Sequence, residues 1–96
     1  MLDRFLRYVK IDTRAHDRSA PCPSTPGQLA LPRRLAAELR AIGLPDVDLD
    51  ATGYLMATVP ASVDRAVPTI GLVAHVDTSP EMPGNGVRPI VHERWD

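Results

Sequence analysis

The chain has 96 residues, of which 44% are apolar and 24% are charged, a composition typical of folded globular proteins and unlike that of disordered chains. Eleven Lys and Arg against 12 Asp and Glu leave a formal net charge of -1, so no positive excess attracts nucleic acid or an acidic membrane surface. A chain this short buries only about 60–65% of the surface that its unfolded form exposes, so a self-sufficient core would be marginal.

Cysteine content and hydropathy predict where in the cell the protein is located. The single cysteine, Cys22, cannot form an internal disulfide. Charges at Asp3, Arg4 and Arg7 interrupt the N-terminal residues, and no run of about 18 apolar residues occurs that could form a transmembrane helix. We therefore expect a cytoplasmic protein with neither a membrane nor a nucleic-acid partner.

The first predicted element is a short amphipathic helix at the N-terminus. Four apolar residues recur at the i, i+3, i+4 and i+7 spacing of one helix face: Leu2, Phe5, Leu6 and Val9. Residues 12–26 have no apolar period and contain three prolines, which predicts a surface loop.

A second helix is predicted to begin after Thr25. Thr25 and Gln28 have the spacing of a capping box, and Pro26 would stand at the first helical position, where its missing N–H costs nothing. Pro32 conflicts with this helix and predicts either a kink or a later start. Gly43 marks the end. The buried stripe is predicted to consist of Leu31, Leu35, Leu39 and Ile42.

Strand signals follow. Aspartates alternate with apolar residues over 46–50, and a turn at 51–53 leads into residues 54–60, which predicts a hairpin with one polar face. Residues 69–74 form an apolar run without alternation, as in a strand buried on both faces of a parallel or mixed sheet. Two helices, a hairpin and a buried strand place the chain in the α/β class.

The pair most suited to chemistry follows this predicted strand. The period of two residues places His75 and Asp77 on one side of the strand, roughly 6.6 Å apart at Cα. A neutral imidazole binds a metal through one nitrogen while a carboxylate accepts the proton on the other. The alternative is a histidine that only caps the strand end, and a catalytic zinc usually needs about three protein ligands. His16 and His92 lie in polar segments and are expected to be solvated.

Three stretches of the sequence resemble a known family. They are PSTPGQ at 23–28, GYLMATVP at 53–60 and IGLVAHVDTSP at 70–80. Together they are similar to the N-terminal part of the tripeptide aminopeptidases in the co-catalytic zinc peptidase family, which also contains carboxypeptidase G and aminoacylases. The resemblance runs along nearly all 96 residues.

This resemblance implies a role for each member of the pair. His75 would ligate one of two zinc ions, and Asp77 would be the active-site carboxylate that orients it. The family's other ligands and its general-base glutamate have no counterpart in these 96 residues. The isolated chain is therefore expected to be inactive.

The resemblance also implies an architecture. Residues 1–96 would be the N-terminal portion of a layered αβα catalytic domain, incomplete as a domain, with the rest of that domain and a smaller dimerisation domain absent. The complete enzyme would be a homodimer that removes the N-terminal residue from tripeptides. Alternatives are a dipeptidase or deacylase of the same family, and a non-catalytic truncated remnant or small binding module.

Overall fold

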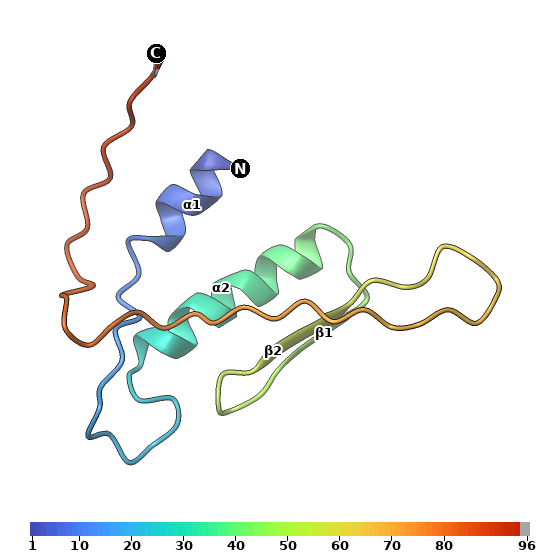
Figure 1. The fold of residues 1–96 in the computed structure, drawn as a ribbon, viewed down its shortest axis with the longest axis horizontal. Coiled ribbons are helices and arrows are strands. Elements are labelled where there is room, and N and C mark those ends of the chain that lie inside the picture. Colours follow the sequence, from blue (N-terminus) through green and yellow to red (C-terminus); the bar gives the residue numbers. More distant parts are fainter. Residues whose placement is uncertain (95–96) are drawn as a thin grey trace.

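A computed structural model describes residues 1–94 of the chain. Its elements follow the order α1 (Leu2–Tyr8), α2 (Gly27–Ala41), β1 (Asp46–Leu49) and β2 (Leu55–Thr58). A long segment without regular secondary structure follows β2 and runs back past the helices toward the C-terminal residues (Figure 1). The two predicted helices and the predicted hairpin are thus confirmed, and the described part of the chain is a mixed α/β arrangement.

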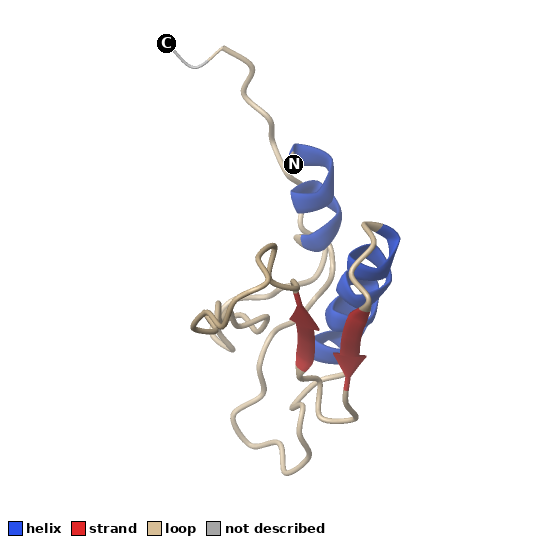
Figure 2. Ribbon diagram, turned by 90° about the vertical axis from the view of Figure 1, so that its right-hand side faces the viewer, coloured by secondary structure: helices blue, strands red, loops and turns tan. Residues whose placement is uncertain are grey.

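The hairpin packs against α2 (Figure 2). Strands β1 and β2 are antiparallel, with Leu49 opposite Leu55 in the register. Along β1 the aspartates are exposed, whereas Val47 and Leu49 are half-buried, which is the predicted alternation. Arg40 of α2 also donates a hydrogen bond to the carbonyl of Val47, at 2.9 Å. One apolar face of the hairpin therefore meets the helix, and the polar face meets solvent.

Asp50 holds the turn between the two strands. Its Oδ1 accepts hydrogen bonds from the Thr52 hydroxyl at 2.8 Å, the Thr52 N–H at 2.9 Å and the Tyr54 N–H at 2.9 Å. The hydroxyl of Thr52, helped by the backbone N–H groups, holds the pKa of the Asp50 carboxyl below its usual value. Gly53 completes the turn with φ +94°, a conformation that side chains disfavour.

The start of α2 differs from the predicted capping box. The Thr25 hydroxyl donates to the carbonyl of Arg14 at 2.9 Å and caps no helix N–H. The Gln28 side chain accepts the N–H of Ser24 at 3.1 Å instead of reaching Thr25. The prediction was wrong because part of the preceding segment packs over the helix start and supplies a closer partner for each side chain. The helix begins at Gly27, which excludes a later start, and Pro32 lies fully buried within it.

Helix α1 is tied to α2 by the carboxylate of Glu38. Tyr8 donates its hydroxyl to Glu38 Oε2 at 2.5 Å. Three guanidinium groups surround the same carboxylate at 3.3–3.4 Å, those of Arg4, Arg7 and Arg34. The hydrogen bond from Tyr8, with the neighbouring arginines, lowers the pKa of Glu38. Since α1 contains no buried residue, these polar contacts are a large part of what holds it.

Docking of α1 should therefore weaken in acid. The pKa of Glu38 in the folded chain lies below its unfolded value of 4.5, so the carboxylate stabilises the docked helix above pH 4.5. That contribution is lost as the pH falls through the folded pKa. We expect the NMR signals of the Tyr8 ring to move toward those of an exposed tyrosine between about pH 5 and pH 3. Glu38→Gln should show the displaced signals already at neutral pH, and an unchanged Tyr8 environment in this variant would contradict the prediction.

The predicted buried strand at residues 69–74 does not form among the described residues. These residues have no strand pairing and are exposed: Ile70 is 84% exposed, Leu72 96% and Val73 98%. A strand buried on both faces needs a neighbouring strand for its backbone and covering elements for its side chains. Within residues 1–94 the only sheet is the two-stranded hairpin, so nothing supplies either.

The described residues enclose a very small core. Across residues 1–94, the buried apolar residues are Ala36, which is 2% exposed, and Pro32. The exposed surface of 8267 Å² is about one and a half times that of a compact protein of this mass. The radius of gyration of 16.4 Å likewise exceeds the roughly 12–13 Å of a compact 96-residue domain. In the described part of the chain, no helix has the length and hydropathy to cross a membrane.

The isolated chain should consequently unfold without a sharp transition. Little apolar surface is removed from water, and exposed residues such as Leu72 and Val73 offer contacts to other copies. We expect a broad thermal transition by circular dichroism and concentration-dependent association by sedimentation. A sharp two-state transition of a monomer would contradict this expectation.

Candidate metal centre

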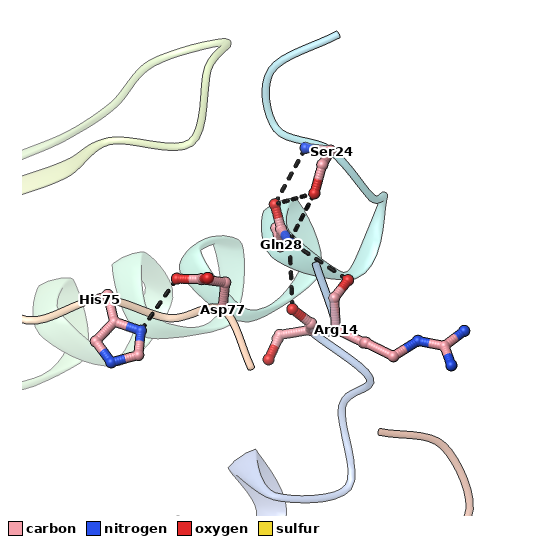
Figure 3. A network of polar contacts seen from close by, with 6 residues as sticks. Arg14, Ser24, Gln28, His75 and Asp77 are labelled. Carbon is pink, nitrogen blue, oxygen red and sulfur yellow. Dashed lines mark hydrogen bonds and ion pairs between the residues drawn. The ribbon is translucent and has the colours of Figure 1, made fainter. Parts of the chain in front are cut away.

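His75 and Asp77 lie together in the extended segment, as their spacing predicts. His75 Nδ1 and Asp77 Oδ1 are 3.0 Å apart, a hydrogen-bond distance (Figure 3). Their side chains are 84% and 51% exposed. The backbone between them is extended, so the two side chains point to the same side although the segment belongs to no sheet strand.

This contact selects one nitrogen of the ring for a metal. An imidazole with its proton on Nδ1 donates that proton to Asp77 and keeps the lone pair on Nε2. A carboxylate in this position also orients the ring and makes it a more basic ligand. The donor chemistry thus fits one zinc ligand with its orienting carboxylate.

The rest of a metal centre is not assembled in the described residues. Among residues 1–94 no group of three or more His, Cys, Asp and Glu side chains is placed to hold an ion. His16 lies in the loop before α2, where its backbone N–H donates to Ser24 Oγ at 3.1 Å. Cys22 is exposed, with its sulfur 3.9 Å from the carbonyl of Thr52. Within residues 1–94, His75 therefore stands outside any group of three or more side chains that could hold an ion.

The backbone beside Asp77 is anchored to the N-terminal part of the chain. Thr78 and Arg14 form a parallel β-bridge. Ala15 donates its N–H to the carbonyl of Thr78 at 3.0 Å, and Thr78 donates its N–H to the carbonyl of Thr13 at 3.3 Å. Residues 13–15 are thus not the plain surface loop that the prolines of this region predict, and Thr13 is only 3% exposed.

Sequence reasoning missed the side chain that braces this bridge. Gln28, 7% exposed, donates its Nε2 to the carbonyls of Thr13 and Arg14 at 3.3 and 3.4 Å. In Figure 3 it lies between the start of α2 and the segment that pairs with Thr78. The only sequence signal for this role was the polar run that ends at Gln28, and the spacing of that run predicted a capping box instead.

Comparison with known proteins agrees with the resemblance. No protein-family model matches the chain. Curated relatives named peptidase T match it along all 96 residues: the proteins of Geobacillus thermodenitrificans (strain NG80-2), Geobacillus sp. (strain WCH70) and Listeria monocytogenes serotype 4a (strain HCC23) are 51%, 49% and 46% identical to it. In each case the match covers 100% of this chain and 23% of the relative. All 96 residues are therefore homologous to peptidase T, and the chain spans less than a quarter of the length of these relatives.

Proposed function

We propose that residues 1–96 form the N-terminal portion of the catalytic domain of a cytoplasmic, zinc-dependent tripeptide aminopeptidase. The observation that carries the proposal is the His75–Asp77 hydrogen bond within a chain that is 46–51% identical to peptidase T along its whole length. Peptidase T is the tripeptide aminopeptidase of the family that the sequence resembles. The layered αβα domain would be completed, and the dimerisation domain supplied, by residues outside this sequence.

In the complete enzyme, a homodimer, His75 would hold one of two zinc ions through Nε2. Asp77 would keep the proton of His75 on Nδ1 and fix the plane of the ring. When bound, zinc supplies Lewis acidity that polarises the scissile carbonyl of the tripeptide and stabilises the developing oxyanion. The general base and the other ligands would come from elsewhere in the enzyme, so we expect the 96-residue chain alone to be inactive.

The exposure of His75 and Asp77 supports the proposal that the remaining ligands come from another part of the enzyme. A histidine and a carboxylate that are 84% and 51% exposed can accept further ligands and a substrate from another part of a larger protein. The apolar residues of 69–74 lie beside them in sequence and are exposed as well. In the proposed domain they would become the buried strand, with neighbours provided by the missing part of the sheet.

A chimera tests the function. Residues 1–96 replace the aligned 96 residues of the peptidase T of Geobacillus thermodenitrificans, and this protein is called the chimeric peptidase below. We expect it to bind zinc and to release the N-terminal residue of a tripeptide, while the isolated chain does neither at a comparable level. Dipeptides and N-acyl amino acids, assayed in parallel, distinguish the related dipeptidase and deacylase. A folded, zinc-loaded chimera with no hydrolytic activity would support a non-catalytic remnant instead.

A further inference from the structure

The side chain of Gln28 makes hydrogen bonds to Thr13, Arg14 and Ser24, and the proposed chemistry does not use it. Its Nε2 donates to the carbonyls of Thr13 and Arg14, and also to Ser24 Oγ at 3.0 Å. Its Oε1 accepts the Ser24 N–H at 3.1 Å and lies 3.3 Å from the Ser24 hydroxyl. With both ends of the amide engaged and 7% exposure, the side chain is fixed in one position (Figure 3).

One of the two carbonyls that Gln28 contacts also pairs with Thr78, and the other belongs to the peptide group whose N–H pairs with Thr78. The carbonyl of Thr13 accepts from Gln28 Nε2 at 3.3 Å and from the Thr78 N–H, also at 3.3 Å. The N–H of Ala15, the residue after Arg14, donates to the carbonyl of Thr78 at 3.0 Å. Thus a continuous set of contacts connects the first turn of α2 with the backbone immediately after Asp77.

We propose that Gln28 is a positioning residue for the His75–Asp77 pair. The inference rests on the proposed function. Both side chains of the pair are exposed and lie in a segment without regular secondary structure, so packing does not fix their direction. The bridge at Thr78 fixes the backbone next to Asp77, and Gln28 fixes the other side of that bridge. If the Asp77 carboxylate moved, its hydrogen bond with His75 Nδ1 would break, and the ring could turn away from the metal.

A primary amide suits this position for a chemical reason. Two carbonyls require donors, whereas the N–H of Ser24 requires an acceptor, and a glutamine side chain provides both. Glutamate has nearly the same shape and keeps the acceptor for Ser24. It has no N–H for Thr13 and Arg14 and would place a negative oxygen against their carbonyls. Gln28→Glu therefore removes the brace while changing the side-chain volume very little.

The first measurement is amide hydrogen exchange of the chimeric peptidase, read by mass spectrometry in the peptides that contain Ala15 and Thr78. We expect Gln28→Glu and Gln28→Ala to raise both exchange rates about 2- to 10-fold, as the loss of a hydrogen-bonded support does. Arg33→Ala is the matched control, since it removes a long polar side chain from an exposed position of the same helix. Unchanged exchange in both peptides of the Gln28 variants would overturn the proposal.

The second measurement is steady-state hydrolysis of a tripeptide by the chimeric peptidase, with zinc content measured on the same samples. Gln28→Glu should lower kcat about 2- to 10-fold, below the 10- to 100-fold range for residues that contact a metal ligand directly, with a smaller effect on KM. A purely structural role would lower the amount of folded enzyme and leave kcat per zinc-loaded molecule unchanged, and that result would overturn the proposal.

Two further comparisons keep the outcome decisive. If a Gln28 variant loses the helical signal in circular dichroism, Ser24→Ala takes its place, because it removes one partner of the amide and leaves the donors to Thr13 and Arg14 in place. It should shift exchange and kcat in the same direction by less, and no shift in either would count against the proposal. An inactive wild-type chimera would refute the proposed function, whereas an active one with an insensitive Gln28 would refute only the positioning role.

Discussion

Replacing His75 with alanine should reduce tripeptide hydrolysis by the chimeric peptidase to background and empty or weaken one of its two zinc sites. The substitution removes the imidazole whose Nδ1 lies 3.0 Å from the Asp77 carboxylate, the contact that leaves Nε2 for a metal. Among residues 1–94 no group of three or more His, Cys, Asp and Glu side chains offers an alternative metal site. The measurements are zinc stoichiometry by elemental analysis and release of the N-terminal residue from a tripeptide.

Asp77→Asn should separate turnover from metal binding in the same assay. Asparagine keeps the size of the side chain but loses the negative charge that favours the Nδ1 proton of His75. We expect activity to fall about 10- to 100-fold, with zinc retained better than in His75→Ala. Asp64→Asn, at an exposed aspartate in the segment after β2, is the matched control and should leave both values unchanged. Full activity of Asp77→Asn would show that the carboxylate only caps the local backbone.

Gly27→Ala should strongly destabilise the packing at the start of α2. A Cβ at this position would lie 1.6 Å from the carbonyl oxygen of Asp12 and 2.7 Å from its carbonyl carbon. Both are backbone atoms, so no side-chain rotation relieves the overlap and residues 12–15 must move away. We expect a loss of about 3 kcal/mol in the free energy of unfolding, at the upper end of the range for overpacking, measured by urea denaturation of the chimeric peptidase.

The displacement should also reach the candidate metal centre. Moving residues 12–15 separates Thr13 from Gln28 and weakens the bridge to Thr78, so activity should fall along with stability. Arg33→Ala is the control, because it changes an exposed position of the same helix and adds no atom beside residues 12–15. Equal stability of the two variants would mean that residues 12–15 do not pack against α2 in solution.

The local pattern of the sequence determined the helices and the hairpin. The apolar spacing in α1 and α2 and the alternation in β1 span only a few residues each, so the type and position of these elements are predictable from the local sequence. Gly43 ends α2 in the left-handed conformation, at φ +91°, as its position after the apolar stripe predicted. The contact between His75 and Asp77 is of the same kind, because an extended backbone alone brings residues i and i+2 to one side.

Tertiary structure decided what the side chains at the start of α2 do. Thr25 and Gln28 had the spacing of a capping box, but the Thr25 hydroxyl donates to the carbonyl of Arg14, and the Gln28 amide donates to the carbonyls of Thr13 and Arg14. No local rule predicts that a segment 11–15 residues upstream packs there, since the approach depends on a glycine at 27 that leaves room for the Asp12 carbonyl.

The segment at 69–74 shows the opposite limit. Its composition predicted a strand, but strand formation requires hydrogen bonds from a neighbouring chain segment, and residues 1–94 provide none there. Its apolar sequence favours a strand, but the strand forms only when another segment supplies the hydrogen bonds of a sheet. The sequence by itself thus determined the two helices, the hairpin and the contact between His75 and Asp77. The tertiary structure decided how Gln28, Thr13 and Thr78 join those elements, because hydrogen bonds between distant segments depend on where the whole chain places them.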